Sequence, residues 1–289
     1  MPIPRTEKRM SWKITSDSTC DLSPEQLTKY GISLIPLHVA MGGSNYLDGV
    51  DATPAQIYAH VDAGGQLPVT AAINPAEYTE FFSRFAKDND FIIHICLSAE
   101  FSSCYQNACT AAADFGNVYV VDSRNLSTGH GHMVLAAVEM AAAGLPAPKI
   151  VERLNELAPK VDASFILSRL DYLRKGGRCS SLAALGANVL KLRPSILVRD
   201  GKMTVSKKYR GAFAKCMCEY IKDRLSAGGE IDEKRIFITH SGLDEGLLRL
   251  AEDTVRSLRE FDEICITHSG CTISSHCGPG CMGVLFIHK

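Results

Sequence analysis

The sequence lacks a long apolar run and any block of one charge. No stretch comes near the roughly eighteen consecutive apolar residues that a membrane-spanning helix needs, and the N-terminal MPIPRTEKRM has no apolar signal-peptide core. Basic and acidic side chains number 31 and 32, and no run of Lys or Arg exceeds two. These absences argue against nucleic acid as a partner. We expect a cytoplasmic protein with a small or apolar partner and at most transient membrane contact.

Familiar nucleotide and hydrolase motifs are also missing. There is no GxxxxGK[ST] loop and no GxSxG elbow. The segment GHGHMV, residues 129–134, follows a predicted strand but has only two of the three glycines of a dinucleotide-binding turn. We therefore expect no bound cofactor.

The cysteine count is odd and the spacing irregular, which does not fit a disulfide framework. Of the 11 cysteines, several lie inside apolar patterns, such as Cys96 in FIIHICL and Cys265 in EICIT. A free cysteine in such a pattern is usually a small buried hydrophobic residue. We expect the cysteines to remain thiols.

The first half of the chain alternates apolar strands with helical segments, which predicts an α/β fold with a mostly parallel sheet. The predicted strands are WKIT, ISLIPLHV, DFIIHICLS and NVYVVDS. Predicted helices begin at Pro54 after Thr53 and at Pro75, and others span about 127–143 and 148–158.

The second half has a different pattern, which predicts an α+β domain with a mixed or antiparallel sheet. ASFILS, PSILVR and MTVSKKY are predicted strands, RDGK is a hairpin turn between the last two, and helices follow near 211–226 and 244–259. We therefore predict two domains, residues 1–161 and 162–289.

The segment SSHCGPGCMG, residues 274–283, combines residues that bind metals or catalyse reactions. Cys271, His276, Cys277 and Cys281 are all of metal-ligand type, but their C-x4-H-C-x3-C spacing does not match paired zinc ligands. Cys277 as a nucleophile with His276 as its base is hindered by their adjacency in a loop. We predict no metal, and keep as the alternative a small-molecule enzyme that uses Cys277 and His276 or a bound metal.

Several predicted strands end in loops rich in small hydroxyl residues and glycine. In open α/β sheets, ligands bind beyond the carboxyl ends of the strands. Ser102 is positioned to cap the predicted helix SSCYQNACTAAADF, where free N–H groups favour a carboxylate or phosphate. This pattern favours a ligand whose anionic group binds at the carboxyl ends of the strands.

Seven segments, taken together, resemble the motif series of the DegV family in order and spacing. They are SDSTCDLS, YLDGVD, LPVT ending at Thr70, LSAEFSSCYQNA, VVDSRNLSTGHG, LDYLRKGGR and SSHCGPG. They extend over nearly the whole chain. The resemblance implies a two-domain protein that buries a long-chain fatty acid in a tunnel and has no catalytic residues of its own. It further implies that the N-terminal domain holds the ligand tunnel and that the C-terminal domain closes over its polar end.

The resemblance also assigns roles to residues of this chain. Thr70, Ser102 and His276 match the positions that hold the fatty-acid carboxylate. Asp48, Ser98, Gly278 and Gly280 match supporting positions around that site.

The partner implied by the resemblance is a separate ATP-dependent fatty-acid kinase. Arg178 and Arg210 match basic positions that face the opening and the kinase, and the carrier is expected to be a monomer when free. The chain departs from the family pattern at TAAINP, where a serine, a glutamine and a proline are replaced, and at Ser102-Ser103-Cys104-Tyr105. These departures leave both expected hydroxyls in place.

Overall fold

A four-stranded parallel sheet forms the centre of the N-terminal half. The computed structural model describes residues 10–183 and 192–289. The sheet has the order β2-β1-β6-β7, and all its strand pairs are parallel, as predicted. Its strands are β1 (Trp12–Asp17), β2 (Ser33–Ile35), β6 (Phe91–Cys96) and β7 (Val118–Asp122). Every residue of β6 is buried, because helices cover both faces of the sheet.

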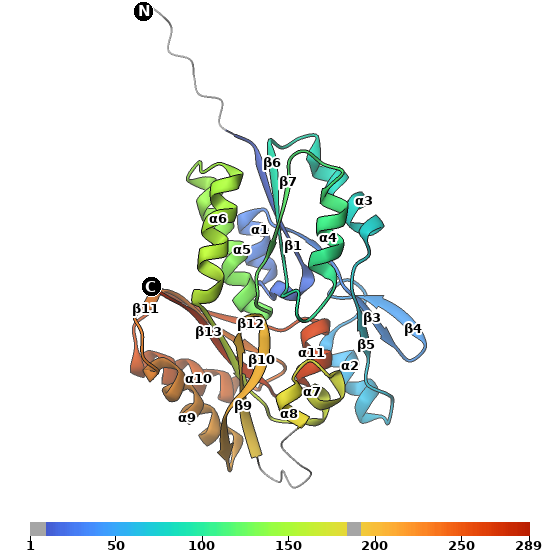
Figure 1. Ribbon diagram of the computed structural model, residues 1–289. Coiled ribbons are helices and arrows are strands. Elements are labelled where there is room, and N and C mark those ends of the chain that lie inside the picture. The colour runs from blue at the N-terminus through green and yellow to red at the C-terminus, as the bar shows by residue number, and fades with distance from the viewer. Residues whose placement is uncertain (1–9, 184–191) are drawn as a thin grey trace, which may run out of the picture.

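Two pairs of helices flank this sheet on opposite sides (Figure 1). One layer has α5 (Ser127–Ala142) and α6 (Ala147–Leu157), and the other has α3 (Pro75–Ala86) and α4 (Cys104–Ala112). The remaining helical elements are η1 (Ser18–Cys20), α1 (Pro24–Tyr30), α2 (Pro54–Asp62) and η2 (Ala158–Lys160). Side-chain caps at Thr53 and Asn74, each followed by proline, start α2 and α3 where the sequence predicts.

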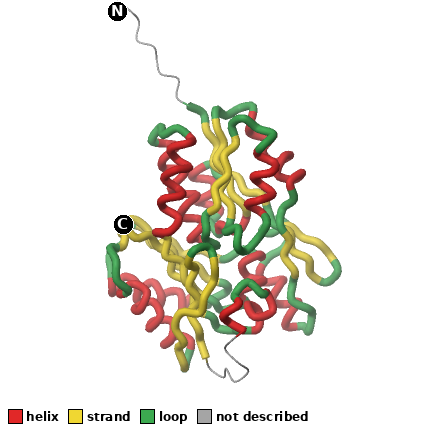
Figure 2. The backbone as a smooth tube through the Cα atoms, viewed as in Figure 1, coloured by secondary structure: helices red, strands yellow, loops and turns green. Residues whose placement is uncertain are grey.

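A six-stranded mixed sheet, order β10-β9-β8-β13-β11-β12, forms the C-terminal half (Figure 2). Only β11 and β12 pair in parallel, so the predicted mixed sheet is confirmed. The strands are β8 (Val161–Ile166), β9 (Leu192–Arg199), β10 (Lys202–Arg210), β11 (Ile231–His240), β12 (Glu263–His268) and β13 (Met282–His288). The helices are α7 (Asp171–Gly176), α8 (Ser180–Ala183), α9 (Phe213–Ser226), α10 (Glu245–Leu258) and α11 (Cys271–Cys277).

A third, small sheet was not predicted from the sequence. It has the antiparallel order β4-β3-β5, with β3 (His38–Met41), β4 (Ser44–Leu47) and β5 (Val69–Ala71). The segment ISLIPLHV, predicted as one strand, is divided between β2 and β3 because Pro36 has no N–H to continue the ladder. After this division the chain leaves the parallel sheet, and β3 pairs with β5. Strand β5 in turn contacts α11 of the C-terminal half.

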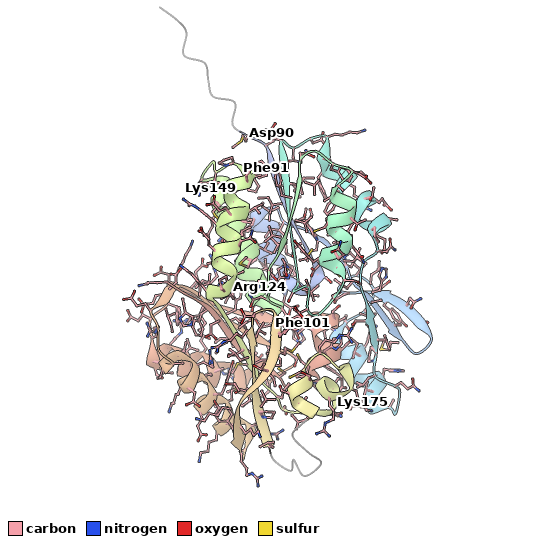
Figure 3. All side chains as sticks on the ribbon, viewed as in Figure 1. Asp90, Phe91, Phe101, Arg124, Lys149 and Lys175 are labelled. Carbon is pink, nitrogen blue, oxygen red and sulfur yellow. The ribbon has the colours of Figure 1, made fainter. Side chains whose placement is uncertain are left out.

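The two halves share a continuous core. Helix α5 contacts β1 and β6 on one side and β8, β11 and β13 on the other, and most of its residues are buried. The β9–β10 turn, with positive φ at Asp200 and Gly201, also touches the N-terminal half. There Ser98 donates its hydroxyl to the carbonyl of Gly201 at 2.9 Å. Arg124, labelled in Figure 3, also pairs with Asp200 of this turn at 3.4 Å. The two-domain division at 161/162 stays a prediction.

In the described parts of the chain, no helix is both long enough and apolar enough to cross a bilayer.

A buried histidine predicts how acid affects the fold. His94 on β6 is fully buried against Tyr78, and burial lowers its pKa to about 3. The ring is therefore neutral in the folded protein but takes up a proton below about pH 6.5 when unfolded. Between pH 7.5 and 5, we expect the wild type to lose about 2 kcal/mol more unfolding free energy than His94→Gln. Urea unfolding at both pH values measures this, and parallel pH profiles would contradict it.

Candidate functional site

A cavity of about 170 Å³ lies where the two halves meet, beyond the carboxyl end of β6. Its walls come from loops and strands of the N-terminal half, from β10 and from α11. The lining residues are Leu37, Thr70, Ala71, Ala72, Leu97, Phe101, Ser102, Ser103, Leu126, Arg178, Met203, Thr272, Ile273, His276 and Cys277. The cavity therefore combines an apolar wall with hydroxyl, imidazole and guanidinium groups.

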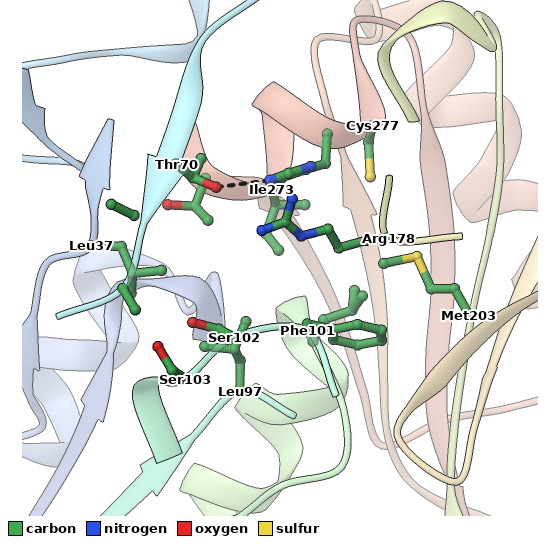
Figure 4. A pocket seen from close by; sticks show the side chains of 15 residues that line it. Leu37, Thr70, Leu97, Phe101, Ser102, Ser103, Arg178, Met203, Ile273 and Cys277 are labelled. Atoms are coloured by element: carbon green, nitrogen blue, oxygen red, sulfur yellow. Dashed lines mark hydrogen bonds between the residues drawn. The ribbon is translucent and has the colours of Figure 1, made fainter. Parts of the chain in front are cut away.

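Thr70 and His276 meet in this cavity although they are far apart in the sequence (Figure 4). The hydroxyl oxygen of Thr70 on β5 lies 2.9 Å from Nε2 of His276 on α11. Burial, and secondarily the charge of Arg178, lowers the pKa of His276 to about 4. The ring is therefore neutral at pH 7, and it can gain a proton when an anion binds beside it.

Helix α11 carries much of the site, and sequence reasoning missed it. The segment expected as an extended loop is a seven-residue helix that brings Thr272, Ile273, His276 and Cys277 to the cavity. Cysteine, serine and threonine have modest helix propensity, and Gly270 at the N-cap position has no side chain to cap the helix. The side chains that cap and stabilise this helix come from elsewhere in the chain.

Two buried carboxylates from the N-terminal half supply those caps. Asp48 accepts the backbone N–H groups of Cys271 and Thr272 at 2.6 and 3.1 Å. Asp21 accepts the N–H of Gly270 at 2.8 Å. A Cβ on Gly270 would lie 3.0 Å from Asp48 and 3.3 Å from Asp21, so glycine allows both carboxylates to approach. Negative charge at a helix N-terminus is favourable.

Ser102 lines the cavity next to the start of α4. The helix begins at Cys104, later than predicted, and Ser103 occupies the N-cap position without a side-chain cap. Ser102 instead accepts the N–H of Cys104 at 3.3 Å. Ser98, four residues earlier in the chain, donates to the carbonyl of Gly201 and so joins the two halves, and its supporting role at the site stays a prediction.

The glycines near His276 allow close packing. Gly278 and Gly280 both have positive φ, and a Cβ on Gly278 would lie 2.7 Å from the ring of Tyr172. Gly176, at the end of α7, packs against His276: a Cβ there would lie 2.4 Å from Nδ1. These contacts fix where the imidazole can lie.

The two predicted basic residues have different positions. Arg178 is exposed, lines the cavity and donates to the carbonyl of Gly176 at 2.9 Å. Arg210 is exposed at the far end of β10 from Met203 and does not line the cavity. At about 3.3 Å per strand residue, Arg210 lies roughly 20 Å from that wall. Its role at an opening stays a prediction.

Comparison with known proteins identifies the family. The sequence model of the DegV family, described as "Uncharacterised protein, DegV family", matches residues 11–289. The chain belongs to the DegV family. A DegV domain-containing protein of Caldanaerobacter subterraneus is 31% identical over 280 residues, covering 96% of this chain and 98% of the relative.

Two solved structures of fatty-acid-binding proteins share this fold. A fatty-acid-binding DegV protein from Thermus thermophilus has a TM-score of 0.88 and 26% identity, covering 97% of this chain and all of that one. A stearic-acid-binding protein from Eubacterium ventriosum has a TM-score of 0.81 and 25% identity, covering 96% and 98%. These ligands are properties of those proteins.

Cysteines near the cavity form hydrogen bonds with other groups of the protein. Cys271 donates its thiol to the carbonyl of Ala52 at 3.2 Å, and a hydrogen bond with Cys277 raises the pKa of Cys281 well above its usual value. Within residues 10–183 and 192–289, no three metal-ligating side chains converge. His276 bonds Thr70, and successive helix residues point about 100° apart, which does not favour His276 as a base for Cys277.

A serine, a histidine and an aspartate also lie together in the core. Ser16 Oγ lies 2.9 Å from Nε2 of His130, whose Nδ1 lies 3.9 Å from Asp17. All three are fully buried. His130 Nε2 also lies 3.0 Å from the carbonyl of Ile95, so these three residues join α5 to the sheet. Because all three are buried, a substrate cannot reach them.

Asp21 gives a test of the α11 clamp. Burial, with the charges of Asp48 and Asp17, raises the pKa of Asp21 to about 8, so the carboxyl is protonated at pH 6. Asparagine can keep its bonds to Gly270 and Ser127, and we expect Asp21→Asn to cost less than about 1 kcal/mol at pH 6. As the pH rises from 5 to 8, the wild type should lose roughly 3 to 4 kcal/mol relative to the variant, because the unfolded state gives up this proton near its ordinary pKa while the folded state keeps it up to about pH 8.

Urea unfolding of both proteins at pH 5, 6 and 8 measures this. Asp48→Asn serves as the comparison, because an amide cannot accept both helix N–H groups. It should cost about 1–3 kcal/mol at pH 6. Equal pH dependence in wild type and Asp21→Asn would contradict the assignment.

Proposed function

We propose that this chain binds a long-chain fatty acid and presents the carboxylate to a separate ATP-dependent kinase. The observation that carries the proposal is the amphipathic cavity between the halves, with Thr70 and His276 hydrogen-bonded in its wall. The fatty acids bound by DegV neighbours of the same fold support it. The chain is then a carrier, as the family resemblance implies.

The apolar wall provides a path for the acyl chain. A second cavity of about 30 Å³ adjoins the first and shares Leu126, Ile273 and Cys277 with it. Together the two are smaller than the roughly 300 Å³ or more of typical ligand sites, so a long chain must displace these side chains. Each buried methylene contributes about 0.8 kcal/mol, which can offset that rearrangement. The path uses residues on both sides of position 161.

The polar end suits a carboxylate. Hydroxyls of Thr70 and Ser102 and an N–H of His276 are donors, and Arg178 adds positive charge at the edge. Asp48 supports them by holding α11, and Gly278 and Gly280 shape the turn that follows it. Because Arg178 is exposed as well as lining the cavity, we assign it to the kinase-facing side. Arg210 would contribute only to a wider docking surface.

Fatty-acid binding predicts that ligand accompanies the purified protein. Denaturing mass spectrometry should detect a bound fatty acid, and delipidated protein should rebind palmitate or stearate. Thr70→Val combined with Ser102→Ala should weaken binding by roughly a hundredfold, since two hydrogen bonds to a charged group are lost. Ser83→Ala, whose hydroxyl bonds its own helix at Glu80, is the control and should bind like the wild type.

A protein that remains empty and refuses both fatty acids would contradict the proposal. Unchanged affinity in the double variant would instead show that the carboxylate lies elsewhere. Stoichiometric zinc would favour an enzyme built on Cys277 and His276.

The kinase step predicts a division between binding and transfer. With the partner kinase and ATP, the palmitate-loaded protein should yield acyl-phosphate. Arg178→Ala should slow this transfer at least tenfold while changing palmitate affinity less than threefold, because the guanidinium lies at the exposed edge. Equal losses in the two assays would contradict this division, and the absence of any acyl-phosphate would contradict the carrier role.

A further inference from the structure

Thr272 shares the face of α11 that carries His276. The two residues are four apart on the helix, so their side chains lie one turn from each other on the same side. Both line the main cavity. A group that contacts the imidazole is therefore within reach of the threonine side chain.

The hydroxyl of Thr272 has no hydrogen-bond partner among the described residues. The residue is 5% exposed, and its Oγ1 is buried. Buried hydroxyls are nearly always hydrogen-bonded, because leaving one unpaired costs free energy. By contrast, Thr70 bonds His276, and the nearby Ser275 bonds the carbonyl of Cys271. Thr272 is thus a cavity residue with an unused donor.

The backbone around Thr272 is held firmly. Its N–H donates to Asp48 at 3.1 Å, and that of Cys271 donates to the same carboxylate. The clamp fixes the first turn of α11 and with it the Cα–Cβ direction of Thr272. The residue is therefore held at the cavity wall, so a ligand that uses its hydroxyl needs little backbone ordering.

The cavity has few other donors on the β5 side. After Thr70, the lining continues with Ala71 and Ala72, which offer only methyl groups. A carboxylate has two oxygens and can accept several hydrogen bonds. A hydroxyl from α11 would supply a hydrogen-bond donor that the alanine side chains cannot.

We propose that Thr272 is a further carboxylate-binding residue, whose hydroxyl donates to the bound fatty acid beside Thr70 and His276. This rests on the proposed function, because it needs an anionic head group in the cavity. The unpaired hydroxyl then gains its partner when the ligand binds. The part of the site carried by α11 consists of a hydroxyl and an imidazole spaced by one helical turn.

Two substitutions at this position separate the hydroxyl from the methyl group. Thr272→Val keeps the shape and removes the donor, whereas Thr272→Ser keeps the donor. With palmitate as the probe, we expect Thr272→Val to bind roughly ten- to a hundredfold more weakly, the effect of one hydrogen bond to a charged acceptor. Thr272→Ser should bind within about threefold of the wild type.

Two controls show whether the effect belongs to the head group. Hexadecan-1-ol has the same chain without the carboxylate, and its affinity should change less than threefold in Thr272→Val. Thr254→Val removes a buried hydroxyl that bonds Leu250 at 2.7 Å within α10, outside the cavity lining. That variant should bind palmitate like the wild type.

The outcomes separate this proposal from the function it rests on. If the wild type binds palmitate and Thr272→Val binds it equally well, the role of Thr272 is overturned and the fatty-acid function stands. Equal loss in Thr272→Val and Thr272→Ser, or equal loss for palmitate and hexadecan-1-ol, also overturns it, since packing would then explain the change. If the wild type binds neither probe, both proposals fall.

Discussion

The site depends on two carboxylates from one half of the chain that cap a short helix in the other. Asp48 and Asp21 accept the first three free N–H groups around α11, at Gly270, Cys271 and Thr272. A seven-residue helix has little stability of its own, so this capping decides whether it forms. Because α11 carries His276, the same contacts join the halves and place the imidazole opposite Thr70.

The two carboxyl groups lie close together beside Gly270, and burial is the main cause of the raised pKa of Asp21. The like charge of Asp48 repels that of Asp21, which contributes to raising the pKa of Asp21. A protonated Asp21 still accepts the N–H of Gly270 and bonds Ser127, the first residue of α5. The proton on Asp21 reduces the repulsion between the two acids, so that both can accept N–H groups of α11. Asp21 also links the start of α5 to the start of α11.

Local signals in the sequence predicted the regular elements well, whereas the site depended on contacts between distant residues. Thr53-Pro54 starts a helix through neighbouring atoms, and Asp200-Gly201 forms its hairpin turn in the same way. Helix α11 was missed because its caps lie more than 200 residues earlier, at Asp21 and Asp48. The grouping of Thr70, Ser102 and His276 came from family resemblance, since no local pattern links β5 with α11.

The glycines of GHGHMV resemble those of a dinucleotide-binding turn, but here they allow close packing. They do not form a phosphate-binding turn: both lie inside α5, where a Cβ on Gly129 would come within 2.9 Å of Ala163, and one on Gly131 within 2.8 Å of the carbonyl of Cys20. Each glycine costs a helix about 1 kcal/mol relative to alanine, so the benefit must come from packing. Gly129 faces the C-terminal sheet and Gly131 faces the N-terminal half. The two glycines therefore let α5 pack closely against both halves at once.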